Sequence, residues 1–478
     1  MLRLLLGIAV STLVAVQPVT TSTSAAQSGN WRPAVDKIFA SWDTRQSPGC
    51  AVGVYKDGAI AYERGYGMAD LEHDVPIAPD TPFYIGSVSK QFTAFAAALL
   101  IQQGKAGLDD PIRKYFPELP EYANGITVRH LVHHTSGLRD FYTLLSIAGR
   151  RQDELYDNFA VLRMAARQKD LNFPPGTDYL YSNTGYALLA SLIGRAAGTT
   201  FSAFVDANIF KPLGMASSHV HDDDARLVKG RAYGYSGAIG ALRLDASTAE
   251  RVGAGGVYST IPDLIKWDEN FYTGKVGGRG LIDQVQTPGS LSDGKPLTYA
   301  WGLQIGRYRG LPIVEHGGSL VGYRAHLMRF ADKHISIACL CNHAGIAPGT
   351  LARRVADIVI GSGFGEAAPS TPAQPGAGRG GAPAGPAQAP AAAPALADFA
   401  GTYYSDEIDG RFTITVKDGL FVQRETDAVP APLVPSAVDE FRFGGMTVRF
   451  VRGADRTVQA LLVDAGRVRG IRFDRRGR

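Results

Sequence analysis

Ser87 and Lys90 stand three residues apart at the start of an apolar helical pattern, in the segment Phe83-Tyr-Ile-Gly-Ser-Val-Ser-Lys90. Side chains at this spacing share one face of a helix, so the hydroxyl and the amine are expected to meet. Burial favours a neutral lysine, which can take the serine proton. The pair therefore predicts a nucleophilic serine that forms an acyl-enzyme. The alternative is a serine that caps a core helix, with Lys90 extended to solvent.

The surroundings separate this pair from a second match to the same spacing. Ser292 and Lys295 are also three residues apart, but they lie in a loop rich in glycine and proline with no helix to align them. Ser87 instead follows the small Gly86 and precedes a long apolar helix. The sequence therefore favours Ser87 as the nucleophile.

A second motif, Tyr181-Ser-Asn183, follows the rigid segment Pro174-Pro-Gly-Thr177 and precedes a helical pattern from residue 186. A phenol can pass a proton between nucleophile and leaving group, and an amide can hold the substrate and the lysine in place. The same spacing occurs in Tyr122-Ala-Asn124 and Tyr156-Asp-Asn158. Only the motif at Tyr181 combines a rigid loop before it with an apolar helix after it.

A third motif, His316-Gly317-Gly318-Ser319, ends a strand pattern that begins at Leu311. Two glycines would leave an edge of backbone bare, against which a substrate can lie. The backbone amides of Ser319 and Ser87 would then point at a developing oxyanion. The alternative is a glycine turn that closes a hairpin.

The elements that must position these residues alternate along the chain. Residues 50–55 and 59–63 predict two strands joined by a tight turn, residues 86–275 are mostly helical, strands resume over 299–342, and a last helix covers 351–360. The predicted helices within the middle region cover 92–103, 186–197 and 261–271. This order predicts an α+β domain whose first and last strands meet in one antiparallel sheet.

Composition divides the chain of 478 residues into four segments. Residues 1–26 have the charge, apolar run and small-residue end of a secretory signal peptide, so we expect an exported protein, periplasmic or secreted. Residues 27–362 form the main domain. Residues 363–395 are a linker rich in proline, alanine and glycine, and residues 396–478 alternate as a small antiparallel β domain, a barrel or a sandwich. No membrane span is expected in the mature chain.

Charge, cysteines and histidines exclude several classes of protein. The net charge is +4 without a basic cluster, so nucleic acid is not an expected partner. The three cysteines, Cys50, Cys339 and Cys341, form no C-x-x-C pair, so a disulfide scaffold is not expected. Cys339 and Cys341 share one face of a predicted strand and are predicted to be buried free thiols. The clustered histidines lack the H-E-x-x-H arrangement of a catalytic zinc site, so we expect neither a metal nor a cofactor.

Together, Ser-Val-Ser-Lys, Tyr-Ser-Asn and His-Gly-Gly resemble, in this order, the motifs of the penicillin-recognising serine hydrolases. This family includes class C β-lactamases, D,D-carboxypeptidases, D-aminopeptidases and related esterases. The resemblance covers residues 31–362 and is supported by three further segments: Val128-Arg-His-Leu-Val-His-His-Thr-Ser-Gly-Leu138, Phe210-Lys-Pro-Leu-Gly-Met215 and Gly253-Ala-Gly-Gly-Val-Tyr-Ser259. It implies a β-lactamase-like antiparallel sheet flanked by helices, with a helical subdomain.

The resemblance also implies roles for individual residues. Ser87 would be acylated, Lys90 and Tyr181 would share the proton transfers, and Asn183, His316, Gly317, Gly318 and Ser319 would bind the substrate. Gly317 departs from the family, which commonly has a threonine there that binds a substrate carboxylate. His316 replaces the more usual lysine and is expected to be partly charged. Arg324 is a candidate for the missing positive charge. The tail from Phe399 is similar to the barrels appended to some D-aminopeptidases, where such a barrel can shape access to the cleft.

The sequence thus predicts an exported serine hydrolase that cleaves an amide or ester through an acyl-enzyme. The substrate would be a small molecule or peptide, such as a β-lactam, a carboxylic ester or a D-amino-acid peptide derived from the cell wall. One alternative is a penicillin-binding protein or sensor that is acylated but turns over poorly. Another is a scaffold without catalysis, which the intact Ser87, Lys90 and Tyr181 disfavour. Neither the exact substrate nor the oligomeric state follows from the sequence.

Overall fold

An antiparallel sheet forms the centre of the main domain in the computed structural model, which describes residues 30–151, 157–364 and 396–477. Within these residues the sheet has six strands in the order β10-β11-β12-β13-β1-β2. The strands are β1 (Cys50–Lys56), β2 (Ala59–Tyr66), β10 (Gln304–Tyr308), β11 (Leu311–Leu320), β12 (Tyr323–Phe330) and β13 (Ile335–Cys341). β1 pairs with β13, so the first and last strands lie side by side, and the predicted α+β fold is confirmed. The expected signal peptide, residues 1–26, and all but the first two residues of the expected linker, residues 363–395, lie outside the described residues.

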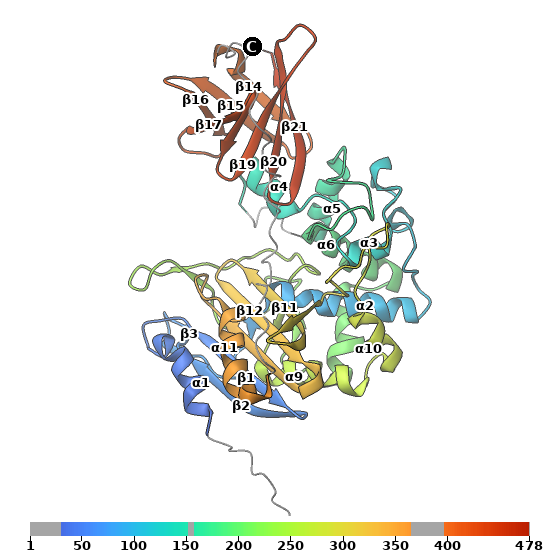
Figure 1. Cartoon of the computed structure of the whole chain (residues 1–478), viewed down its shortest axis with the longest axis vertical. Helices are drawn as coiled ribbons and strands as arrows, with labels where there is room; N and C mark the ends of the chain where they lie inside the picture. The colour runs from blue at the N-terminus through green and yellow to red at the C-terminus, as the bar shows by residue number, and fades with distance from the viewer. Residues whose placement is uncertain (1–29, 152–156, 365–395, 478) are drawn as a thin grey trace, which may run out of the picture.

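Helices cover both faces of this sheet (Figure 1). On one face, α1 (Arg32–Phe39) and α11 (Pro348–Ile360) bury Phe39 and Val355 against strand residues such as Val54 and Ile337. On the other face, α2 (Lys90–Gln102) and α9 (Ile261–Thr273) pack together in the main core, where Phe92 of α2 contacts the fully buried Trp267 of α9. The sheet is therefore the middle of three layers.

The remaining described elements form the helical part of the domain and its short strands. The helices are α3 (Val128–Val132), α4 (Phe141–Ala148), α5 (Asn158–Arg167), α6 (Asn183–Ala197), α7 (Phe201–Val205), α8 (Lys211–Leu213) and α10 (Gly278–Gln286). The short strands are β3 (Met68–Asp70), β4 (Val75–Pro76), β5 (Phe83–Tyr84), β6 (His219–Val220), β7 (Tyr235–Ser236), β8 (Arg243–Leu244) and β9 (Val257–Ser259).

Helices α2 and α6 begin earlier than the apolar patterns indicated. A 3-10 turn over Gly86–Ser89 leads directly into α2 at Lys90, and every residue from Lys90 to Leu100 is buried. Helix α6 begins at Asn183, because the Ser182 side chain accepts a hydrogen bond from the Gly185 amide and caps the helix. Both predicted motifs therefore lie at the N-terminal ends of buried helices.

None of the described helices is by itself long and apolar enough to cross a membrane. Helix α6 and the following segment Phe201–Leu213 meet the length and composition test only as a pair, and they are bent by 78° where they join. Most residues of α6 are buried in the main core.

The C-terminal strands close into an eight-stranded barrel within residues 401–476. The strands are β14 (Gly401–Ser405), β15 (Gly410–Val416), β16 (Leu420–Arg424), β17 (Ala431–Ala437), β18 (Glu440–Phe443), β19 (Met446–Arg452), β20 (Val458–Ala465) and β21 (Val468–Arg476). Pairing of Tyr403 with Arg475 joins the first strand to the last. Of the two predicted forms, the barrel is correct, and buried residues such as Phe412 and Phe473 stack inside it.

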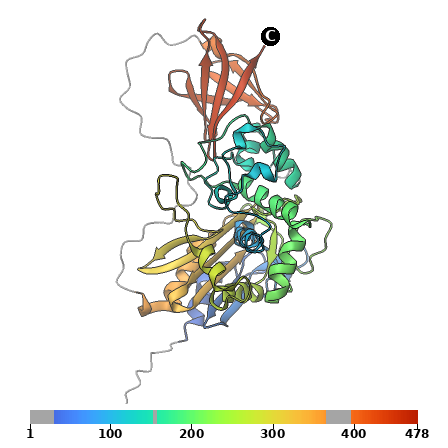
Figure 2. The ribbon, with the colours of Figure 1, turned by 90° about the vertical axis from the view of Figure 1, so that its right-hand side faces the viewer.

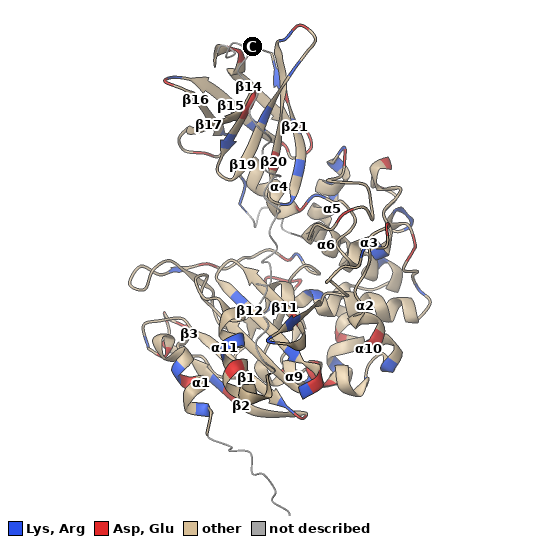
Figure 3. Ribbon diagram, in the orientation of Figure 1, with Lys and Arg blue, Asp and Glu red and all other residues tan. Residues whose placement is uncertain are grey.

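The barrel packs on helices α4 and α5 of the main domain (Figures 1 and 2). Apolar residues of α4, including Phe141 and Leu145, share one core with the inner residues of the barrel. Arg139 and Glu407 form an ion pair of 2.6 Å across the contact, with side chains only 3% and 4% exposed. Because a buried charge needs its partner, this pair holds the barrel in one place on the domain. Acidic and basic residues occur on both parts (Figure 3).

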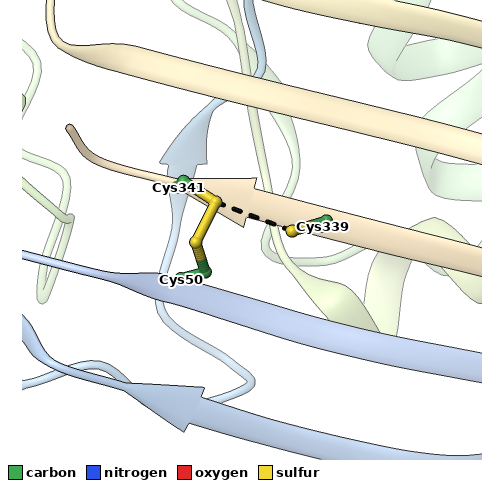
Figure 4. Close-up of side chains that lie close together, drawn as sticks. All are labelled: Cys50, Cys339 and Cys341. Atoms are coloured by element: carbon green, nitrogen blue, oxygen red, sulfur yellow. Dashed lines mark hydrogen bonds between the residues drawn. A yellow bond between two sulfur atoms is a disulfide. The ribbon is translucent and has the colours of Figure 1, made fainter. Parts of the chain in front are cut away.

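The prediction of buried free thiols is correct for Cys339 and wrong for Cys341. Cys50 of β1 and Cys341 of β13 form a disulfide, and only Cys339 among the described cysteines is free (Figure 4). The two bonded residues are direct partners in the β1/β13 register, although 291 positions separate them in sequence. Sequence spacing could not show this pairing. Cys339 lies on the same face of β13, with its Sγ 3.6 Å from that of Cys341.

Removal of the disulfide is expected to destabilise the main domain. The double variant Cys50→Ala, Cys341→Ala should lower the free energy of unfolding by about 2–5 kcal/mol, because the bond constrains the unfolded chain. Urea denaturation followed by tryptophan fluorescence measures this loss. Cys339→Ala is the matched control, since it removes a buried sulfur without a cross-link and should cost about 1 kcal/mol. Equal losses in the two proteins would contradict a stabilising disulfide.

Candidate active site

Ser87 and Lys90 meet at the N-terminal end of α2. Lys90 Nζ lies 3.1 Å from Ser87 Oγ, 2.8 Å from Asn183 Oδ1 and 2.7 Å from the Ala254 carbonyl oxygen. The lysine is 0% exposed, whereas Ser87 is partly exposed. Burial lowers the pKa of Lys90 well below its ordinary value, with a smaller contribution from the charge of Arg467.

These contacts suit a neutral amine. A neutral amine has two N–H donors and one lone pair, so it can donate to Asn183 and Ala254 and accept the hydroxyl proton of Ser87. The lone pair then faces the atom that must lose its proton. The geometry fits a general base acting on a serine nucleophile.

Tyr181 completes the cluster around the serine. Its ring centroid is 4.7 Å from Lys90 Nζ, and burial raises its pKa although the neighbouring Ser87 side chain lowers it. Its loop is held by His134, which accepts hydrogen bonds from the Ser182 amide at Nδ1 and from the Leu180 amide at its carbonyl oxygen. The His134 ring also packs on Tyr181 with centroids 4.2 Å apart. His134 thus positions the phenol.

Asp140, which the motifs did not reveal, orients the amide of Asn183. One carboxylate oxygen accepts from both the Asn183 backbone amide, at 2.7 Å, and its Nδ2, at 2.8 Å. With Nδ2 turned to Asp140, the carbonyl oxygen of the Asn183 side chain faces Lys90. Asp140 also caps α4 by accepting from the Thr143 amide. An N-cap could be predicted from the sequence, but its link to the site could not.

The third motif lies against the serine turn through an unusually close backbone approach. A Cβ added at Gly318 would lie 2.0 Å from the Ile85 carbonyl oxygen, and one at Gly86 would lie 2.7 Å from the Ser319 amide nitrogen. Gly86 also has a φ of +53°, which favours glycine. Only glycine at both positions lets β11 approach the turn that carries Ser87. The Ser87 and Ser319 amides are thereby brought near one another, as an oxyanion site requires.

Gly317 differs from Gly318 in its surroundings. It is exposed, and an added Cβ would come no closer than 3.5 Å to the atoms around it. The backbone therefore does not require glycine there.

His316 is a neutral, buried residue rather than the partly charged one expected from the sequence. Its Nε2 lies 3.0 Å from the Tyr299 hydroxyl and its Nδ1 lies 2.7 Å from the Gly317 carbonyl oxygen. Burial and the neighbouring Lys90 lower its pKa to about 3. Arg324, the other candidate cation, donates from its guanidinium to the carbonyl oxygens of Val321 and Tyr323. A guanidinium from the barrel lies beside Tyr181: the Cζ of Arg467 is 4.6 Å from the ring centroid.

A pocket with aromatic walls adjoins the two segments that carry the oxyanion amides. Its lining includes Tyr84, three residues before Ser87, and Leu320 and Val321, which follow Ser319. Tyr142 and the buried Arg251, whose guanidinium lies 5.3 Å from the Tyr142 ring centroid, form another wall. His221 and Ser247 add polar groups to the lining.

Two clusters among the described residues have metal-ligand atoms close enough for one ion: Cys50 with Cys339 and Cys341, and Asp70 with Glu72 and His73. Neither contains a residue of the site, and two of the cysteines form the disulfide.

Comparisons with known proteins identify the family of the main domain. A family model described as Beta-lactamase matches residues 35–360. The chain is 29% identical over 301 residues to a D-aminopeptidase of Gluconobacter oxydans, covering 63% of this chain and 57% of that protein. It is 30% identical over 318 residues to a D-aminopeptidase of Brucella anthropi, covering 66% and 60%. The chain thus spans less than two thirds of the length of these relatives.

Solved structures show the same fold. The octameric penicillin-binding protein homologue from Pyrococcus abyssi superposes with a TM-score of 0.62 at 22% identity, covering 93% of this chain and 99% of that one. The D-amino acid amidase from Ochrobactrum anthropi SV3 superposes with a TM-score of 0.59 at 24% identity, covering 70% and 99%.

Asp140→Ala is expected to destabilise the protein more than loss of a simple helix cap. It removes the cap of α4 and leaves two buried donors of Asn183 without an acceptor, which should lower the free energy of unfolding by about 2–4 kcal/mol. Asp157→Ala is the matched control, because Asp157 caps α5 by accepting from Ala160 and should cost about 1 kcal/mol. Urea denaturation of both variants measures the difference. Equal costs would argue against the role of Asp140 in holding Asn183.

Proposed function

The chain belongs to the β-lactamase family, and from this premise we propose that it is a serine hydrolase that cleaves amides through an acyl-enzyme on Ser87. The contact of Lys90 Nζ with Ser87 Oγ carries the proposal. A buried amine with a lowered pKa and its lone pair on a hydroxyl is the chemical requirement for activating a serine.

The steps follow from the positions of the side chains. Lys90 takes the hydroxyl proton as Ser87 Oγ attacks the substrate carbonyl carbon. The amides of Ser87 and Ser319 stabilise the negative oxygen that forms. Tyr181 passes a proton to the leaving nitrogen, so the amine departs and the acyl group stays on Ser87. Water then attacks the ester carbonyl carbon and loses a proton to Lys90 or Tyr181. The proton returns to Ser87 Oγ as the ester bond breaks, which releases the acid and the free serine.

The proposed substrates are amides or short peptides of D-amino acids. The names of the curated relatives support this choice.

We also propose that the protein is exported. The N-terminal segment has the composition of a signal peptide. The Cys50–Cys341 disulfide supports the same conclusion, because such bonds persist in oxidising compartments outside the cytoplasm.

Ser87→Ala is expected to abolish both acylation and turnover. Wild type and variant are exposed briefly to an activated ester, a penicillin and a D-amino-acid amide, and intact-mass spectrometry measures the adduct while chromatography measures product. A transient adduct on wild type alone, with product released, supports the hydrolase. A persistent penicillin adduct would instead indicate a sensor that turns over poorly. An adduct that survives Ser87→Ala would contradict the assignment of the nucleophile. The mass of protein recovered from the periplasm also reports whether residues 1–26 are removed.

The rate of acylation is expected to fall at acidic pH as Lys90 becomes protonated. The pKa of Lys90 is lowered from its ordinary value, so the neutral base persists far below pH 10.5, and the loss begins only below this lowered pKa. A profile of kcat/KM over about pH 4 to 9 measures it. His316→Gln is the control and should leave the acid limb in place, because the pKa of His316, about 3, keeps it neutral over most of this range. A limb that moves with His316, or a flat profile, would contradict Lys90 as the base.

A further inference from the structure

Two histidines with the spacing His-x-His lie at the pocket that adjoins the oxyanion segments. His219 begins the short strand β6, and His221 directly follows that strand. Residues two apart in an extended segment point to the same side, so the two imidazoles meet. His219 Nε2 lies 3.3 Å from His221 Nδ1. His221 lines the pocket together with Tyr84 and Leu320, and the pair contains none of the residues that activate the serine.

Packing on one tyrosine holds both rings in place. The strand pairing sets His219 opposite Tyr258 of β9, and the two rings stack with centroids 5.5 Å apart and planes at 6°. The same tyrosine meets the His221 ring edge-on, with centroids 5.1 Å apart. The His221 backbone amide donates to the Gly256 carbonyl oxygen at 2.6 Å. Both imidazoles are thus positioned by the fold itself.

The separation of the two nitrogens is that of two ligands on one metal ion. Imidazole nitrogen binds Zn²⁺ at about 2.0–2.1 Å in tetrahedral sites, which places two such nitrogens about 3.3 Å apart. In the free protein the two rings share one hydrogen between Nε2 of His219 and Nδ1 of His221. An ion that binds both atoms takes its place. The hydrogen then moves to the second nitrogen of the same ring, so each imidazole keeps one hydrogen and no proton is released.

The electrostatic surroundings permit a cation at the pair. Metal-binding imidazole must be neutral. Burial lowers the pKa of His219 to about 4, and burial also lowers the pKa of His221. The charged side chains that act on the two rings are two cations and two anions: Arg226, Arg231, Asp222 and Asp224. Because these charges balance, a divalent ion meets no net repulsion from them.

We propose that His219 and His221 form a binding site for a divalent transition-metal ion of the type of Zn²⁺ or Cu²⁺. Imidazole nitrogen suits these ions, whereas Mg²⁺ and Ca²⁺ prefer oxygen ligands. The site has two ligands from the chain and leaves the other positions of the ion to water. It goes beyond the proposed hydrolase and takes no part in the steps at Ser87. An occupied site would change one wall of the pocket.

Isothermal titration calorimetry of the full chain without a histidine tag tests the site. Wild type is expected to bind Zn²⁺ and not Mg²⁺. His219→Ala and His221→Ala should each weaken Zn²⁺ binding at least about 10-fold, because even outer-shell partners of a metal ion contribute about 10- to 100-fold to its affinity. Zn²⁺ binding that is unchanged in either variant, or absent from wild type, would overturn the proposal.

His73→Ala is the matched control. It removes an imidazole from Asp70, Glu72 and His73, whose ligand atoms also lie close enough for one ion. Zn²⁺ binding should persist in this variant as in wild type, and its loss there would assign the ion to that cluster and reject the proposal. His219→Phe and His221→Phe form a second set, which keeps a ring against Tyr258 and removes the ligand nitrogen. Both should match the alanine variants, with thermal unfolding in the absence of metal as the check on folding.

Electron paramagnetic resonance of bound Cu²⁺ reads the ligands directly and needs no substrate. Wild type is expected to show coupling of the copper electron to two imidazole nitrogens, and each single variant coupling to one. The same number of coupled nitrogens in wild type and in both single variants would contradict a shared site, whether or not the protein hydrolyses any amide.

Discussion

The amine of Lys90 is buried at the end of α2 and must find all its hydrogen-bond partners inside the protein. A charged ammonium would be costly at zero exposure, so the neutral form is favoured and its lone pair is directed to Ser87. The side chain of Asn183 and the carbonyl of Ala254 accept the two N–H groups. The starts of α2 and α6 and the loop at Ala254 are therefore held together by one nitrogen atom.

The neighbouring residues Arg139 and Asp140 connect this nitrogen to the barrel. Asp140 orients the side-chain amide of Asn183, whose oxygen accepts a hydrogen bond from Lys90. Arg139 forms the buried ion pair with Glu407 and donates to the backbone of the hairpin that carries Arg467. One short segment thus contacts the catalytic cluster on one side and the second domain on the other. The barrel thus borders the site through Arg467. A change in how the barrel packs on the main domain would move this charge relative to Tyr181 and Asp140.

Close approach of two backbones is the second constraint on the site. The β11 edge lies so near the serine turn that a Cβ at Gly86 or Gly318 would collide with backbone atoms. These positions must stay bare for the two amides to converge, whereas Gly317 is free of that restriction. The His-Gly-Gly motif therefore contains one glycine that the geometry requires, Gly318, and one position, Gly317, where the backbone would accept a side chain.

Local patterns in the sequence determined much of the site and of the domain architecture. The three-residue spacing of Ser87 and Lys90, the Tyr181-Ser-Asn183 motif before a helix, and the alternation of the C-terminal strands are short-range signals, and they predicted the site cluster, the α+β domain and a small β domain. Only the tertiary structure decided which distant residues meet. The Cys50–Cys341 bond, the support of Asn183 by Asp140, the neutral state of His316 and the arrival of Arg467 beside Tyr181 depend on strand register, burial and domain docking. Periodicity along the chain reports which face of an element is apolar, but not which residue of another element will lie against it.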